Sequence, residues 1–408
     1  MAKMLRGCLL MGLVLSGCAA SQAQVACEFT PPTGAHIRPG KMVRLGGYFY
    51  TGAIDIPWYG RNFSLLSLNA KNDPALVAGL KRGNPSMLVF QQFLANQIAI
   101  KQTGAQAVEG FDLNAMGSWL LRKADGVPAT PRGPYYLMVD PGSSTQWASH
   151  FTTYTARILA DTGADGLNLD EIPLRPNGMF GGLAKYPSAA DLQAVTSHFL
   201  TTVRAAINKP VLINVGELSS AGANGDAMWN TIGRLIDGAW HEGWVRFYGA
   251  HAQPHAGATW EWDIRSAEQF SAAGKPYIAS TAFANATELE YGIANYLLAT
   301  RGPSLVFQPM LAYDPRTRGG FNFELVRQAV EAHRALIDVD IGCPTGPRER
   351  NKDGLWTRRF RNGLVVVNPE GRARTMTTGD AGLRDVQGQP VAWPMTIPGF
   401  EGRILLNR

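Results

Sequence analysis

Short β-prone segments alternate with longer helical patterns along most of this 408-residue chain, and this alternation most restricts its fold. Such alternation is typical of βαβ units, whose strands form a parallel sheet. Eight segments are predicted to be its strands: 43–50, 63–68, 86–92, 166–170, 211–215, 236–241, 276–280 and 304–307. Their number favours a closed (β/α)8 TIM-type barrel over the alternative, a doubly wound open sheet.

Local signals support parts of this pattern. A helix is expected to begin after Asp73, because Asp is favoured at the N-cap and proline, here Pro74, at the first helical position. An irregular excursion over 94–134 precedes a short extra strand at 136–139. A last helix is expected at 323–337 and would complete the barrel, which we place at 41–340.

The alternation of strand and helix patterns ends after residue 340. Short β-prone segments follow one another at 356–360, 363–368, 391–395 and 402–406. Turn signals, Asn362-Gly363 and Asn368-Pro369, stand between them. We therefore expect a small antiparallel β domain over 341–408.

The first residues resemble an export signal, with Lys3 and Arg6 before an apolar run over 8–14. That run is too short to remain in a bilayer as a spanning helix. Leu15-Ser16-Gly17-Cys18 then resembles the lipobox of bacterial lipoproteins, in which the signal is cut before the cysteine and the thiol carries lipid.

This resemblance implies a signal peptide over 1–17, a lipid anchor on Cys18 and a tether over 18–40. The protein would then be exported and bound to the outer membrane through its lipid. An ordinary signal peptide cut near Ala19 or Ala20 is the alternative.

Composition excludes some partners and leaves one cysteine question open. The net charge of +6 is mild and its basic residues are scattered, so no nucleic-acid partner is expected. Cys27 and Cys343 would remain after processing, and they either form a disulfide or stay free thiols. Cysteines and histidines lack metal-ligand spacing, so neither metal nor cofactor is expected.

The segment Asp165-Gly166-Leu167-Asn168-Leu169-Asp170-Glu171-Ile172-Pro173 carries the strongest chemical signal. Successive strand residues point to opposite faces, so leucines facing the outer helices would turn Asn168 and Asp170 into the barrel. Asp170 would stand at the carboxyl end of its strand, where barrel active sites are built. We expect it to be catalytic; a structural carboxylate is the alternative.

A second carboxylate, Glu242, lies at the end of the sixth predicted strand, between Trp240 and Trp244. A glycosidase needs one ionised and one protonated carboxyl group across the scissile bond. The two indoles could desolvate Glu242 and favour its acid form. Pairing with Arg246 is the structural alternative, and Glu217, after the fifth strand, is the alternative acid.

Further polar and aromatic residues are candidates for binding sugar. Aromatic planes stack on the C–H faces of sugar rings, although core packing is the commoner role of any one aromatic residue. The loop pair Trp58-Tyr59 is the best candidate platform. The full candidate set is Tyr48, Tyr50, Trp58, Tyr59, Asp140, Asn168, Asn214, Trp240, His241 and Trp244.

Two sequence runs resemble a known group of proteins. Tyr136-Leu137-Met138-Val139-Asp140-Pro141-Gly142, a helix and then the Asp170 segment are similar to the putative glycoside hydrolases called glycosyl-hydrolase-like family fifteen. More distantly, 43–310 resembles the endo-α-1,4-polygalactosaminidase family. That resemblance implies a nucleophile at Asp170 and an acid at Glu242, although His241 stands where the family has a glutamate.

These observations together lead us to expect a glycoside hydrolase that cleaves a polysaccharide with an Asp/Glu pair. The alternative is a non-catalytic carbohydrate-binding lipoprotein acting in polysaccharide export or adhesion, because a fold does not guarantee an activity.

Overall fold

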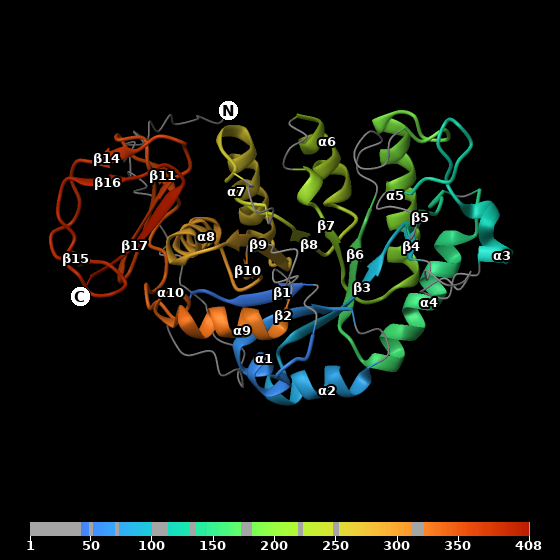
Figure 1. Ribbon diagram of the computed structural model, residues 1–408, viewed down its shortest axis with the longest axis horizontal. Coiled ribbons are helices and arrows are strands. Elements are labelled where there is room, and N and C mark those ends of the chain that lie inside the picture. The colour runs from blue at the N-terminus through green and yellow to red at the C-terminus, as the bar shows by residue number, and fades with distance from the viewer. Residues whose placement is uncertain are drawn as a thin grey trace, which may run out of the picture.

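The computed structural model describes residues 42–48, 52–69, 73–99, 113–130, 136–142, 144–172, 182–218, 223–247, 253–311 and 322–407. Eight strands form a closed parallel barrel (Figure 1). They are β1 (Leu45–Tyr48), β2 (Phe63–Leu68), β3 (Leu88–Leu94), β6 (Gly166–Asp170), β7 (Val211–Asn214), β8 (Gly238–His241), β9 (Tyr277–Phe283) and β10 (Leu305–Leu311). Neighbours run β1-β10-β9-β8-β7-β6-β3-β2, which confirms the predicted barrel and its eight strands.

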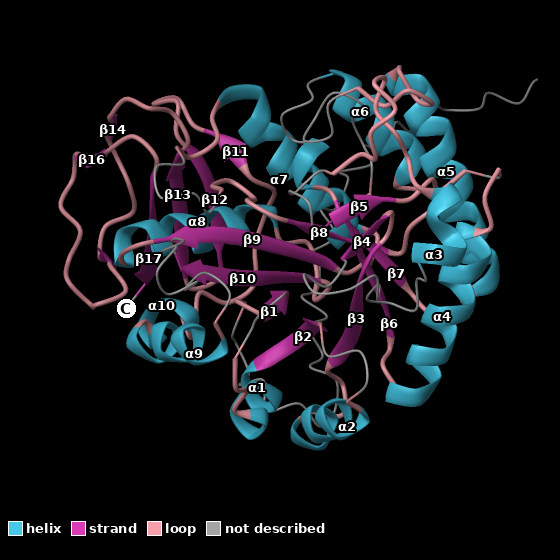
Figure 2. Cartoon of the chain, turned by 45° about the vertical axis from the view of Figure 1, so that its right-hand side comes forward, coloured by secondary structure: helices cyan, strands magenta, loops and turns pink. Residues whose placement is uncertain are grey.

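Helices cover the outside of the barrel (Figure 2). They are α1 (Ile56–Asn62), α2 (Pro74–Gly83), α4 (Trp147–Thr162), α5 (Ala189–Ala206), α6 (Ala223–Ile232), α7 (Gly257–Ala272), α8 (Ala286–Ala299), α9 (Phe323–Ala332) and α10 (Arg334–Ile337). The Asp73 side chain accepts a hydrogen bond from Leu76 N and Pro74 opens α2, so the predicted start is confirmed. The predicted final helix is divided, because His333 separates α9 from α10.

Side-chain alternation along β6 follows the prediction. Leu167 and Leu169 lie in the large apolar cluster that the outer helices share. Asn168 faces inward, where its Nδ2 donates to Ser67 Oγ of β2 at 3.0 Å. A Cβ on Gly166 would lie 2.3 Å from the Pro210 carbonyl oxygen, so only glycine allows the close strand contact at the start of β6.

The excursion after β3 forms a separate two-stranded antiparallel sheet of β4 (Gln97–Ala99) and β5 (Tyr136–Met138). The predicted extra strand at 136–139 therefore lies outside the barrel. The described part of the excursion also contains α3 (Leu113–Met116) and η2 (Gly117–Trp119). Ala95 N donates to the Asp170 carbonyl oxygen at 2.7 Å, which continues the β3–β6 pairing into the excursion.

The C-terminal segment forms the expected antiparallel β domain. Its five-stranded sheet has the order β11-β12-β13-β17-β15, and β14 pairs with β16. The strands are β11 (Glu349–Arg350), β12 (Trp356–Phe360), β13 (Gly363–Asn368), β14 (Arg374–Met376), β15 (Leu383–Arg384), β16 (Met395–Ile397) and β17 (Glu401–Asn407). The strand predicted at 391–395 was placed too early, since only Met395 of that range belongs to β16.

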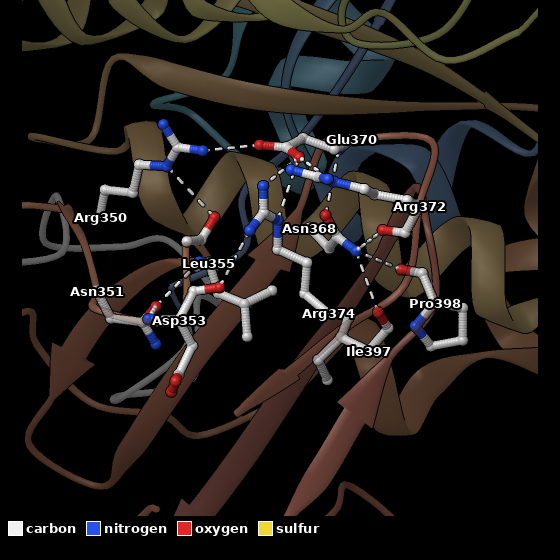
Figure 3. A network of polar contacts seen from close by, with 11 residues as sticks. Arg350, Asn351, Asp353, Leu355, Asn368, Glu370, Arg372, Arg374, Ile397 and Pro398 are labelled. Atoms are coloured by element: carbon white, nitrogen blue, oxygen red, sulfur yellow. Dashed lines mark hydrogen bonds and ion pairs between the residues drawn. The ribbon is translucent and has the colours of Figure 1, made fainter. Parts of the chain in front are cut away.

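A polar network fixes the turn between β13 and β14 (Figure 3). Asn368 Nδ2 donates to the carbonyl oxygen of Arg372 at 2.8 Å. The Glu370 carboxylate accepts from Arg350 at 2.7 Å and from Arg374 at 2.5 Å. The hydrogen bond from Arg374 is the main cause of the lowered pKa of Glu370. Because the Glu370 side chain is partly exposed, at 30%, water screens its ion pairs, and the network shapes the turn more than it adds stability.

Arg358 of β12 joins the β domain to the barrel. Its buried guanidinium donates to the carbonyl oxygens of Leu297, Leu298 and Thr300 at 2.9, 3.0 and 2.6 Å. These are carbonyls at the C-terminal end of α8, which otherwise lack partners and carry the negative end of the helix dipole. Burial lowers the pKa of Arg358 to about 9. The two units therefore share a buried polar contact.

Residues 1–41 lie outside the described residues, and with them the signal peptide, Cys18, the tether and Cys27. Cys343 takes part in a disulfide. Its pairing with Cys27 stays a prediction. Among the described residues, helices long and apolar enough to cross a membrane are absent.

Candidate active site

Asp170, the last residue of β6, is at the carboxyl end of the barrel and only 6% exposed. Its Oδ2 accepts from Tyr48 Oη at 2.5 Å and from Gln92 Nε2 at 3.2 Å. Its Oδ1 accepts from the Glu171 amide at 2.9 Å and from Asn214 Nδ2 at 3.1 Å. Four donors match the four lone pairs of a carboxylate, so the surroundings suit the ionised form.

The backbone turns sharply just after Asp170. Glu171 has a left-handed φ of 54°, which is uncommon for a residue other than glycine. This conformation accompanies the hydrogen bond from its amide to Asp170, and Gln97 Nε2 holds the buried Glu171 carboxylate at 2.6 Å. Strained backbone of this kind often occurs at functional sites. As expected from alternation, Glu171 contacts the excursion instead of the barrel interior.

Asn214 links the two candidate catalytic carboxylates. Its Nδ2 lies 3.1 Å from Asp170 Oδ1 and 3.1 Å from Glu242 Oε2. Its Oδ1 accepts from the Gly216 amide at 3.0 Å, which fixes the orientation of the side-chain amide. The nitrogen must therefore face both carboxylates, and Asp170 and Glu242 lie at one site.

Gly216 makes room for this arrangement. A Cβ on Gly216 would lie 2.6 Å from the Glu242 carbonyl oxygen and 3.3 Å from Asn214 Oδ1. Real Cβ atoms do not approach a backbone oxygen so closely, so any larger residue would displace the chain at Glu242. Gly216 begins the short helix η3 (Gly216–Leu218).

Trp240 forms the floor of the site together with Tyr48. Their rings stack with centroids 3.3 Å apart and an interplanar angle of 25°. Trp240 Nε1 donates to Ser280 Oγ at 2.7 Å, Ser280 donates to Gln308, and Gln308 Nε2 donates to the Tyr48 carbonyl oxygen at 2.9 Å. Both rings are buried, at 1% and 2% exposure, so they support the carboxylates and offer sugar little surface.

The predicted sugar platform at Trp58 and Tyr59 is wrong. Both residues lie in α1, and both side chains are buried. Trp58 Nε1 donates to Glu331 at 2.5 Å, and Tyr59 Oη donates to the Phe323 carbonyl oxygen at 2.6 Å. They are core residues between α1 and α9, which is the alternative role that aromatic residues more often have.

Trp244 and His241 are also misassigned as sugar-binding residues. Trp244 is fully buried and its Nε1 donates to the Asp263 carbonyl oxygen at 2.8 Å. His241 follows Trp240 on β8 and so points to the other side of the strand, where its Nδ1 contacts Tyr277 Oη at 2.8 Å. Burial, followed by the charge of His255, lowers the pKa of His241 well below its usual value.

Asp140 holds a loop and is not directed at the carboxylate pair. It accepts from Lys185 Nζ at 2.5 Å, from Tyr186 Oη at 2.7 Å and from the Gly142 amide at 2.8 Å. Burial alone would raise the pKa of Asp140, but these hydrogen bonds together lower it. Asn168 is likewise inaccessible, because it lies fully buried in the barrel interior below Asp170.

For some predicted site residues, the structure does not describe the residue or its side chain. Tyr50 and Cys18 lie outside the described residues, and the side chain of Glu217 is not described either. Groups of three or more potential metal ligands are absent from the described part of the chain.

Gln92, Ser280 and Gln308 also belong to the site, although they are not among the residues predicted from the sequence. Gln92 Nε2 contacts Tyr48 Oη at 2.5 Å as well as Asp170. A polar residue within an apolar strand was the available signal, since a buried amide requires partners. Its role still depends on which strands become neighbours.

Comparison with known proteins yields structural likenesses only. The glycoside hydrolase domain of PelA from Pseudomonas aeruginosa matches with a TM-score of 0.46 and 13% identity, over 65% of this chain and 94% of that domain. An α-amylase from Anoxybacillus matches with a TM-score of 0.49 and 11% identity, over 90% of this chain and 98% of the other. The maltogenic α-amylase AmyB from Thermotoga neapolitana gives 0.49 and 13%, over 88% and 98%.

No protein-family model matches the chain, and neither does any curated protein. The solved structures therefore show a resemblance to TIM-barrel glycoside hydrolases. With TM-scores below 0.5, they carry nothing about the substrate or the catalytic residues of this chain.

Proposed function

We propose that the protein is a glycoside hydrolase whose catalytic pair is Asp170 and Glu242. The observation that carries this proposal is the shared contact of both carboxylates with Asn214 Nδ2, at 3.1 Å each. Two carboxyl groups facing each other at the carboxyl end of a barrel are the equipment that glycoside hydrolysis requires. Asp140, another carboxylate predicted for the site, is instead occupied in holding a loop.

The two carboxylates have different surroundings, which suggests different roles. Asp170 is surrounded by donors and suits the ionised nucleophile, which would attack the anomeric carbon. Glu242 is half-buried at the end of β8 and would protonate the departing glycosidic oxygen. It would then remove a proton from the water that releases the sugar from Asp170, regenerating both groups.

The common contact with Asn214 also bears on stereochemistry. Because each carboxylate oxygen lies 3.1 Å from one nitrogen, the two oxygens are separated by at most roughly 6 Å. The nearest oxygens of the two carboxylates are thus closer than the roughly 6.5–9.5 Å that separates the carboxyl groups of inverting enzymes, which must fit a water between them. We therefore expect cleavage with retention of anomeric configuration.

Asn214 would change partners when substrate binds. Asp170 has its four acceptor positions occupied, so one contact must open before an oxygen can attack carbon. The Asn214 contact is the one at the partly exposed side of the site. A sugar hydroxyl that accepts from Asn214 Nδ2 in place of Asp170 would couple substrate binding to release of the nucleophile.

The substrate we propose is a polysaccharide, and the proposed location is the outer membrane, through lipid on Cys18. Location and anchor rest on the amino-terminal sequence alone. Labelling cells with an alkyne-bearing fatty acid would test the anchor, because Cys18→Ala should abolish label while Cys8→Ala should not. Label that persists in Cys18→Ala would contradict it.

The catalytic proposal is tested by screening bacterial polysaccharides, including α-linked hexosamine polymers, for released reducing ends. Asp170→Asn and Glu242→Gln should each lose at least about a hundredfold in rate while keeping the wild-type melting temperature within a few degrees. Glu261→Gln, which changes a 40% exposed carboxylate paired with Arg348, is the matched control and should keep its activity. Equal product release by all variants would defeat the proposal. Retention of polymer without turnover would favour the non-catalytic binding protein.

A further inference from the structure

Asp263 of α7 is a charged residue in an unexpected place, because its side chain is completely buried. Its Oδ2 accepts from the Val245 amide at 3.1 Å and from His255 Nδ1 at 2.6 Å. Its carbonyl oxygen accepts from Trp244 Nε1 at 2.8 Å. The carboxylate and the backbone carbonyl of Asp263 thus both contact the short segment that follows Glu242.

That segment, residues 243–246, follows an unusual path. Val245 has a φ of 53°, in the left-handed region that β-branched residues rarely adopt. Gly243 is also left-handed, with a φ of 75°, and a Cβ there would lie 2.3 Å from Phe247 Cδ2. Such a path persists only where surrounding contacts determine it.

Several contacts hold this path: Arg246 forms an ion pair with Glu288 at 2.6 Å, and Asp263 supplies a carboxylate acceptor to the backbone. The Val245 carbonyl oxygen accepts from His255 N at 2.8 Å, and the Trp244 carbonyl oxygen accepts from Thr281 Oγ1 at 2.8 Å. The Val245 amide has Asp263 as its partner. Hydrogen bonds to a charged acceptor are about twice as strong as neutral ones, so the carboxylate of Asp263 gives the Val245 amide a stronger partner than a carbonyl oxygen would.

Burying a carboxylate here costs free energy, which indicates that Asp263 has a specific role. Burial raises the pKa of Asp263, while His255 and the Val245 amide oppose that shift. His241 Nε2 stands 3.5 Å from Oδ1, too far for a hydrogen bond. An apolar residue of similar size would often serve stability as well or better. The contacts instead fix the conformation of one segment.

We propose that Asp263, assisted by His255, is a positioning residue that holds segment 243–246 so that Glu242 faces Asp170. The effect on catalysis rests on the proposed function, in which Glu242 is the general acid. The role of Asp263 in holding segment 243–246 does not depend on that function. Asp263 touches neither carboxylate of the pair in the contacts described, so it acts through the chain that carries Glu242.

Hydrogen exchange on the full chain tests, without a substrate, whether Asp263 holds segment 243–246. In Asp263→Leu, exchange in peptides covering 243–247 should be at least about tenfold faster than in the wild type. Asp263→Asn, which keeps an acceptor oxygen and folds more securely, should be intermediate. Asp226→Leu is the control, because Asp226 also contacts α7, through Arg265, but is 45% exposed. Unchanged exchange over 243–247 in both Asp263 variants would overturn the proposal.

The dependence of kcat/KM on the leaving group tests whether Asp263 affects Glu242 as the general acid. The probes are 2,4-dinitrophenyl glycosides, whose phenolate leaves without a proton, and methylumbelliferyl glycosides of the same sugars. Asp263→Leu should lose about a hundredfold in kcat/KM on the methylumbelliferyl compounds and less than about threefold on the dinitrophenyl compounds, with partial recovery in Asp263→Asn. Equal losses on both would reduce Asp263 to a structural residue and overturn the proposal. If the wild type cleaves neither these glycosides nor any polymer of the screen, the proposed function fails, while exchange still decides whether Asp263 holds the segment.

Discussion

Tyr48 and Asp170, 122 positions apart in the sequence, share a 2.5 Å hydrogen bond in the barrel interior. Tyr48 donates from β1 and Asp170 accepts at the end of β6. Since β2 and β3 lie between these strands, the contact crosses the barrel and depends on its closure. The hydroxyl is thus a direct means of orienting the proposed nucleophile.

Tyr48→Phe should lower catalysis more than stability. The change removes one donor from Asp170 and one acceptor from Gln92, at a cost of about 1–3 kcal/mol in the free energy of unfolding. Tyr59→Phe is the matched control, because it deletes a buried hydroxyl that contacts only the Phe323 backbone in the bonds described. Urea unfolding should show similar losses for both variants, whereas only Tyr48→Phe should lower kcat. Equal kcat values would contradict the assignment.

Asn214→Leu should separate the two carboxylates functionally. The change keeps a side chain of similar size but removes the hydrogen-bond donor that orients both Asp170 and Glu242. We expect kcat/KM to fall by about 10- to 100-fold, in line with the loss of one positioned donor. Kinetics on the polymer found in the screen give the measurement. An unaltered kcat/KM would refute a catalytic role for Asn214.

Gly216→Ala tests the close packing beneath Glu242. The added Cβ would lie 2.6 Å from the Glu242 carbonyl oxygen, so the chain must shift and the carboxyl with it. Gly117→Ala adds the same atom where nothing lies within 4 Å. Activity should fall at least about tenfold in the first variant, since small displacements of catalytic groups are costly. It should stay at the wild-type level in the second, and similar activities would count against the geometry.

His241 should make the fold sensitive to acid. Burial keeps its folded-state pKa well below 6.5, so the unfolded chain binds a proton that the folded chain does not. Stability is then full above about pH 6.5 and falls as the pH drops below it, by at most about 1.4 kcal/mol per pH unit. Urea unfolding at pH 8 and pH 5 should show a smaller loss for His241→Gln than for the wild type. His198→Gln, on the exposed face of α5, should keep the wild-type loss.

Arg358→Met should loosen the contact between barrel and β domain. Three α8 carbonyl oxygens would lose their donor, and we expect a loss of about 3 kcal/mol or more in the free energy of unfolding. Arg359→Met is the neighbouring control, since its 59% exposed pair with Asp380 should contribute less than about 1 kcal/mol. Calorimetry measures both, and equal melting temperatures would contradict the role of Arg358.

The alternation of side chains between the two faces of a strand was predictable from the sequence, and it correctly placed Asp170 inside the barrel. Leu167 and Leu169 face the helices, so Asp170 faces the interior. The same rule applied to β8 turns Trp240 inward and His241 outward, which would have removed His241 from the sugar-binding set. The residues before Glu242 form a strand, so neighbours in the sequence such as Trp240 and His241 lie on opposite faces and do not form one cluster.

Aromatic roles were not predictable from local sequence. Trp58, Tyr59 and Trp244 look like exposed loop residues, yet each packs in the core. The burial of Trp58 and Tyr59 depends on α9, which is distant in the sequence, and that of Trp244 depends on α7. Composition can supply aromatic residues for a cleft, but packing decides which of them reach it.

The sequence by itself determined the alternation of strands and helices that is typical of a barrel, and the position of Asp170 at a strand end. These follow from the periods of strands and helices, which covalent geometry imposes on neighbouring residues. Only the tertiary structure decided that Asn214 joins Asp170 to Glu242, that Tyr48 orients the nucleophile and that Asp263 holds the following segment. Those contacts link residues far apart along the chain, and closure and register of the barrel, which no local period encodes, bring them together.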